Sequence, residues 1–151
     1  MIARTPRTEE FDSTMILMDY FKQDLEEKAP HTAHKWDENS VIKSVRHIQS
    51  HANAQWFNLY EGQRPVGFIS GSFTTCPFNH DLINANIDLC YVIPSHRSYE
   101  AVRLLVEKLE EWASTHRVNE ITITDTGIAG ELQDYYTNMG YTTATWMHKE
   151  Y

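Results

Sequence analysis

A strand that runs directly into a helix is the most informative stretch of this sequence. Polar and apolar residues alternate from Ile83 to Ile93, Pro94 ends the strand, and Arg97 stands just before a helical repeat. The first amides of a helix have no acceptor within it, and together with the helix dipole they favour an anion. The fork of an arginine fits phosphate oxygens. The stretch predicts a phosphate or pyrophosphate site, although an ordinary strand–helix turn with an exposed arginine would have the same pattern.

A second group of residues lies near the C-terminus. Tyr135 and Tyr136 belong to a short predicted helix over 131–139, and Gly140 and Tyr141 follow it. Gly140 is expected to adopt the left-handed conformation that often ends a helix. The pattern places a tyrosine just before the last predicted strand, but by itself it is equally typical of core packing.

Apolar periodicity predicts the elements that position these residues. Helices are expected over 11–25, after 39–40, over 102–113 and over 131–139, with Thr8 as the first N-cap. Strands are expected at 2–5, 56–60, 66–75, 83–93, 120–125 and from 141 onward, with 30–36 and 77–82 as loops. One face of the fourth strand should carry Ile83, Ala85, Ile87, Leu89 and Tyr91. Strands alternate with helices in the second half, which indicates a mixed α/β (α+β) class with a partly parallel sheet.

In this order the residues resemble the GNAT superfamily of acetyl-CoA-dependent N-acyltransferases. Val92-Ile93-Pro94 stands in place of the family's Val-x-Pro step, and Arg97 falls where its pyrophosphate loop begins. The later aromatic-Tyr-x-x-x-Gly-aromatic pattern is matched by 135–141. The resemblance implies a single GNAT-like domain over 1–151, with a mixed, mostly antiparallel sheet, a central parallel strand pair and about four helices.

The resemblance also implies a reaction and its residues. An acetyl group would pass from acetyl-CoA, the cosubstrate, to a primary amine by direct attack in a ternary complex. Asp88 would act as the base, commonly through water, and Tyr136 would protonate the departing thiolate. A backbone N–H near Val92 would stabilise the carbonyl oxygen. The implied cofactor-binding residues are Tyr91, Val92, Arg97, Ser98, Tyr99, Glu100, Ala101 and Val102.

The pyrophosphate loop departs from the family pattern, because two of its glycine positions hold Glu100 and Val102. A Cβ costs room where a ligand approaches the backbone, and Glu100 adds a negative charge, partly offset by Ser98 and Arg103. The alternative hypothesis is therefore a degenerate GNAT fold that acts as a non-catalytic binding or structural module. A minor third hypothesis is a subunit whose final strand pairs with another chain.

Composition narrows the expected partners. Thirteen Lys and Arg against twenty-one Asp and Glu give a net charge of −8 over 151 residues. This balance argues against a general nucleic-acid binder and against a polybasic membrane anchor. We expect an amine-bearing small molecule or protein as acceptor, and a homodimer is compatible with this. Two isolated cysteines and no recognisable secretory signal favour the cytoplasm.

Other reactive residue types have simpler explanations. His47 and His51 are spaced four apart, but no third ligand is identifiable, so they are expected to form a solvated face or contribute to substrate binding, and no metal site is predicted. Trp36 is a candidate wall of the acceptor pocket or a cap on the core. Cys90 is expected to pack, and Ser98 has no matching His–Asp arrangement for nucleophilic catalysis.

Overall fold

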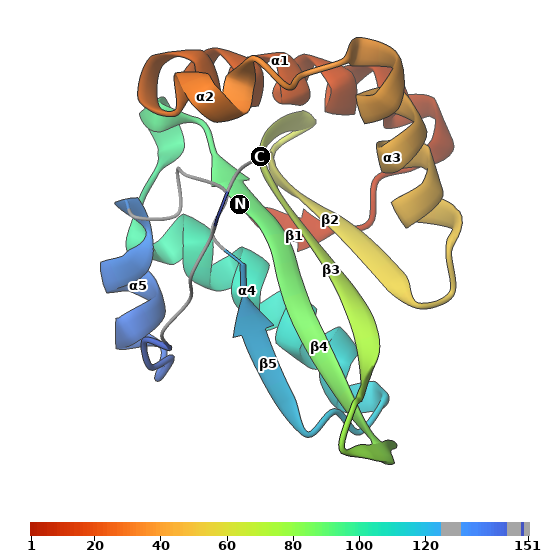
Figure 1. Cartoon of the computed structure of the whole chain (residues 1–151). Helices are drawn as coiled ribbons and strands as arrows, with labels where there is room; N and C mark the ends of the chain where they lie inside the picture. The colour runs from red at the N-terminus through yellow and green to blue at the C-terminus, as the bar shows by residue number, and fades with distance from the viewer. Residues whose placement is uncertain (125–130, 145–148, 150–151) are drawn as a thin grey trace.

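A five-stranded mixed sheet forms the centre of the computed structural model, which describes residues 1–124, 131–144 and 149 (Figure 1). The strands lie in the order of the sequence: β1 (Ile2–Arg4), β2 (Ala54–Glu61), β3 (Arg64–Cys76), β4 (Asn79–Val92) and β5 (Glu120–Ile123). Neighbouring strands are antiparallel except β4 and β5, which are parallel. The mixed α/β class and the parallel pair are thereby confirmed.

Helices cover both faces of the sheet. On one side lie α1 (Phe11–Lys28), α2 (Pro30–Ala33) and α3 (Glu38–Ser50), and on the other lies α4 (Tyr99–Thr115) (Figure 1). The short α5 (Gln133–Asn138) contacts α4. We refer to the two sides of the sheet as the α1 face and the α4 face.

The core has a distinct set of side chains on each face. On the α1 face Trp56 stacks on Phe68, with ring centroids 4.6 Å apart, and Phe21 of α1 contacts both Phe68 and Tyr91. On the α4 face Phe73 stacks on Trp112 of α4 at 4.1 Å. These contacts show which strand residues point toward which layer of helices.

A β-bulge at Asp88 interrupts the pairing of β3 with β4. Ser70 of β3 is paired with Leu89, but the next residue, Gly71, is paired with Ile87, so Asp88 has no cross-strand partner. An extra residue in one strand reverses the side-chain alternation on either side of it. The prediction of one continuous apolar face on this strand is therefore wrong.

The contacts on either side of the bulge confirm this reversal. Leu89 lines a cavity beside α1 on the α1 face. Ile87 pairs with Gly71, whose added Cβ would meet Leu109 of α4 at 2.9 Å, which places Ile87 on the α4 face.

Several expected boundaries also differ. Residues 79–82 are strand rather than loop, because β3 and β4 are joined by a two-residue turn at 77–78. Part of the expected loop 30–36 is α2, which Pro30 begins, a position that suits a residue without an N–H. Thr8 starts a 3-10 turn and is not the N-cap of α1.

Gly140 has φ +94°, as predicted. Residues 141–144 have no regular structure, and most of the expected last strand lies outside the described residues.

Candidate active site

The edge of β4 next to β5 opens just where the bulge begins. Pairing runs from Asn84–Glu120 to Ile87–Ile123, and the Thr124 N–H donates the last bond to the Ile87 carbonyl at 3.1 Å. No β5 partner follows for residues 88–92 in the described part of the chain. The Ile93 N–H donates to Val66 of β3 at 2.9 Å. Since successive peptide groups point to opposite sides of a strand, the Val92 N–H and carbonyl face the open edge.

Asp88 is held at this bulge by a polar cluster. Its Oδ1 accepts a hydrogen bond of 2.6 Å from Asn86 Nδ2. The amide oxygen of Asn86 in turn accepts from the hydroxyls of Thr122 and Thr124, at 2.7 and 3.0 Å. Asn86 precedes Ile87, which faces α4, and therefore lies on the α1 face. The Asp88 carboxylate is thus fixed on the α1 side of the open edge.

Tyr136 approaches the same part of β4 from the opposite face. The residue is 7% exposed, and its ring packs edge-on against Tyr141, with centroids 6.3 Å apart. Burial raises the pKa of the Cys90 thiol to about 12, and a hydrogen bond with Tyr136 opposes that rise. The phenol of Tyr136 therefore lies beside Cys90, which follows Asp88 by two residues on β4.

The Arg97 side chain is mostly buried and already bonded to protein groups, unlike an exposed arginine that would bind an anion. The side chain is only 13% exposed. The guanidinium donates to the Val92 carbonyl at 2.8 and 3.0 Å, to Asp24 of α1 at 2.9 Å and to Glu131 at 2.5 Å. Lys28 also pairs with Glu131, at 2.7 Å. Arg97 thus connects β4, α1 and the segment before α5 across the open edge.

The first turn of α4 retains its role as a candidate anion site. Ser98 is the N-cap, and its Oγ accepts from the Ala101 N–H at 3.2 Å. The preceding amides, of Tyr99 and Glu100, belong to the turn whose N–H groups have no acceptor within the helix. Val102 is fully buried, so its side chain extends into the core.

The negative charge of Glu100 is partly neutralised. Arg103 donates to it at 2.7 Å and also pairs with Glu107 at 2.8 Å. The Arg103 hydrogen bonds lower the pKa of the Glu100 carboxyl, which keeps it ionised beside the helix start. Tyr99 is partly exposed, and its ring lies 6.0 Å from that of Tyr135.

The remaining candidates fall outside this edge. The rings of His47 and His51 lie 4.8 Å apart, but no cluster of three or more potential metal ligands exists among the described residues. Trp36 lines a cavity on the α1 face, together with Phe21 and Leu89.

Asp24 was missed by sequence reasoning. It accepts hydrogen bonds from the Tyr91 hydroxyl and from Arg97, which are 67 and 73 residues away in sequence. No local pattern indicates a pair so distant in the chain.

The comparisons identify the family. The model of the acetyltransferase (GNAT) family matches residues 14–141, so the chain belongs to the GNAT family. A comparison with curated proteins gave no match. In the part of the chain that the structure describes, no helix is long and apolar enough to cross a membrane.

Solved structures share the fold at low sequence identity. A tetramutant of a Bacillus halodurans protein superposes with a TM-score of 0.81 at 11% identity, covering 99% of both chains. A ribosomal-protein-alanine N-acetyltransferase from Brucella melitensis gives 0.76 at 15%, covering 99% of this chain and 95% of its own. An aminoglycoside N-acetyltransferase in complex with CoA gives 0.73 at 10%, covering 99% and 92%.

Proposed function

We propose that this protein is an acetyl-CoA-dependent N-acetyltransferase that acetylates a primary amine. The observation that supports this most strongly is the open edge of β4, where Asp88 and Tyr136 approach from opposite faces. A thioester lying along that edge would have a carboxylate on the α1 side and a phenol on the α4 side. Membership of the acetyltransferase family agrees with this assignment.

The chemistry assigns one step to each residue. The amine nitrogen attacks the thioester carbonyl carbon, and its proton passes to Asp88, directly or through a water molecule. The Val92 N–H, which faces the open edge, donates to the carbonyl oxygen as negative charge develops. The carbon–sulfur bond then breaks, and the thiolate takes a proton from the Tyr136 hydroxyl. The products are an N-acetyl amine and free coenzyme A.

The backbone of the loop from Arg97 to Val102 is the proposed pyrophosphate site. Helix N-termini bind such groups through their free amides and dipole. In this assignment Tyr99 and Glu100 contribute N–H groups, while the Arg97 side chain supports the loop through Val92 and Asp24. Tyr91 supports it as well, since its hydroxyl donates to Asp24 at 2.9 Å.

Thermal unfolding with and without acetyl-CoA tests this proposal. A ligand at about 100 times its dissociation constant adds roughly 2.7 kcal/mol to the free energy of unfolding. We expect a saturable rise in the unfolding temperature with acetyl-CoA. An unchanged temperature at millimolar acetyl-CoA would contradict the proposal.

A second candidate function is a non-catalytic module with the same fold. It is favoured by the engagement of Arg97 with Asp24 and Glu131, and by the carboxylate of Glu100 at the start of α4. Both features work against an anion at this site. This candidate predicts no stabilisation by acetyl-CoA and no release of coenzyme A with any amine.

A further inference from the structure

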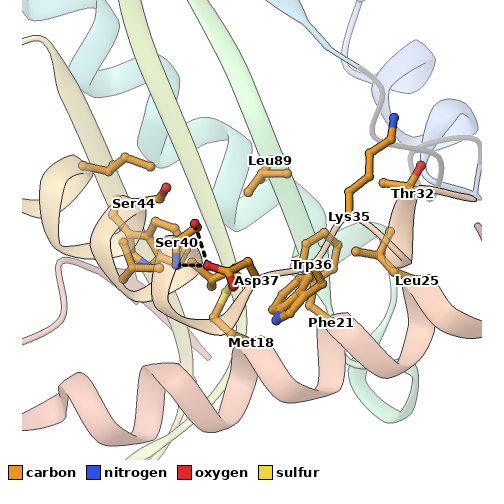
Figure 2. A pocket seen from close by; sticks show the side chains of 14 residues that line it. Met18, Phe21, Leu25, Thr32, Lys35, Trp36, Asp37, Ser40, Ser44 and Leu89 are labelled. Atoms are coloured by element: carbon orange, nitrogen blue, oxygen red, sulfur yellow. Dashed lines mark hydrogen bonds between the residues drawn. The ribbon is translucent and has the colours of Figure 1, made fainter. Parts of the chain in front are cut away.

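An apolar cavity of about 290 Å³ lies on the α1 face, between α1, α3 and the sheet. Figure 2 shows Met18, Phe21 and Leu25 of α1 on one side of it and Leu89 of β4 on another. Trp36 packs edge-on against Phe21 with centroids 6.0 Å apart, so that its indole forms part of the wall. The cavity is about twice the roughly 150 Å³ that holds one benzene ring.

The position of this cavity relates it to the reaction. Leu89 directly follows Asp88, and both lie on the α1 face at the bulge of β4. A molecule that fills the cavity therefore lies on the same side of the sheet as the proposed base. An amino group extending from such a molecule toward Asp88 would reach the open edge from the side opposite to Tyr136.

The two charged side chains of the lining are one carboxylate and one ammonium, so the cavity carries no net charge that would attract a second positive charge. Asp37 is the one carboxylate among the lining residues, and it is the N-cap of α3. Its Oδ2 accepts from the Ser40 N–H at 3.0 Å and from the Ser40 hydroxyl at 2.7 Å, as the dashed lines in Figure 2 show. The other charged lining residue is Lys35, a cation. Burial of an unpaired ammonium against such walls is unfavourable.

From these observations we infer that the acceptor is a small primary amine carried on an aromatic or branched aliphatic body, and not a polyamine or an aminoglycoside. The inference rests on the proposed function for its reaction, but the cavity and its lining are independent of catalysis. The apolar body would lie against Trp36, Phe21 and Leu89, where the hydrophobic effect favours its burial. The amine would be the one polar group directed toward Asp88.

Two acceptors of opposite character test the inference. With acetyl-CoA, we expect 2-phenylethylamine to have a kcat/KM about tenfold or more above that of butane-1,4-diamine, because only the phenyl ring gains from burial. Ser44 is exposed and lines the cavity. We expect Ser44→Phe, which fills the space, to raise the KM for 2-phenylethylamine about fivefold or more and to leave the KM for acetyl-CoA unchanged.

Ser50→Phe is the matched control, because Ser50 is an exposed residue of the same helix and is not among the lining residues. Saturation-transfer NMR of 2-phenylethylamine with the protein alone separates binding from turnover. Saturation transfer to the wild type and to Ser50→Phe that is lost in Ser44→Phe would support the inference. If no amine is acetylated in addition, the absence of turnover would count against the proposed function only. Faster turnover of butane-1,4-diamine, or no transfer to the wild type, overturns the inference and leaves the proposed function standing.

Discussion

The Arg97 guanidinium donates a hydrogen bond of 2.9 Å to the Asp24 carboxylate, linking the end of β4 to helix α1. Both side chains are largely buried, at 13% and 10% exposure. The same guanidinium holds the Val92 carbonyl at the open edge. The pair therefore fixes the geometry of the strand end from which the proposed pyrophosphate loop begins.

Removing either partner of this pair should destabilise the fold. We expect Asp24→Asn and Arg97→Gln each to lower the free energy of unfolding by about 2 kcal/mol, because a buried charge loses its partner. The double variant should lose about 1 kcal/mol less than the sum of the single losses. Urea unfolding of the four proteins measures this, and strictly additive losses would show that the two residues do not interact.

The charge of Glu100 should weaken cofactor binding. We expect Glu100→Gln to lower the Kd for acetyl-CoA about threefold or more, since a carboxylate leaves the proposed anion site and Arg103 loses one of its two partners. Glu111→Gln, near the other end of α4, is the matched control and should leave the Kd unchanged. Isothermal titration of acetyl-CoA measures both. Equal affinities in the three proteins would place the pyrophosphate away from the start of α4.

Cys90 should be inert as a thiol. Burial raises its pKa to about 12, so that only about one molecule in 10⁴ carries the thiolate at pH 8. In the native protein an aromatic disulfide reagent at pH 8 should modify Cys76 first, and Cys76→Ala should abolish the fast phase. Loss of the fast phase in Cys90→Ala instead would contradict the raised pKa of Cys90.

Glu10 should contribute stability that depends on pH. Arg4 donates to both of its carboxylate oxygens, at 2.8 and 2.9 Å, and this lowers the pKa of Glu10 to about 2. A carboxylate with a lowered pKa in the folded state stabilises above its unfolded pKa of about 4.3, and the gain is lost as the pH falls toward 2.

The free energy of unfolding of the wild type should therefore exceed that of Glu10→Gln at pH 6, and the two should converge between about pH 4.3 and 2. Denaturant unfolding at several pH values measures this difference. A difference that does not change with pH would show that the ionised carboxylate is not the source of the stability.

The sequence allowed the order of elements to be predicted, because each strand and long helix has its own apolar period. The parallel neighbour of β4 followed from the strand–helix–strand order around α4. The bulge at Asp88 could not be predicted, because the alternation of residue types along 83–93 does not show which residue lacks a partner in β3. Because of the bulge, Leu89 and Tyr91 lie on the α1 face and not on the face of Ile87. This placement depends on how β4 pairs with β3.

The candidate site was predictable only where its residues are local. The resemblance of 92–102 and 135–141 to the GNAT motifs indicated the loop and Tyr136 as candidate site residues. The contacts of Arg97 with Asp24 and Glu131 span 73 and 34 residues, and they depend on how α1 and the segment before α5 pack against β4. The lining of the apolar cavity likewise comes from α1, α2, α3, β2 and β4, which are distant from one another in the sequence.

The most direct test of the account is the effect of one hydroxyl group on acetyl transfer. Acetyl-CoA and a panel of primary amines are incubated with the wild type, Tyr136→Phe and, as the matched control, Tyr135→Phe, and mass spectrometry follows N-acetyl amine and coenzyme A. We predict equimolar products from the wild type and Tyr135→Phe, and a rate about 100-fold lower for Tyr136→Phe. Absence of product from the wild type, or equal rates in all three proteins, would contradict the account.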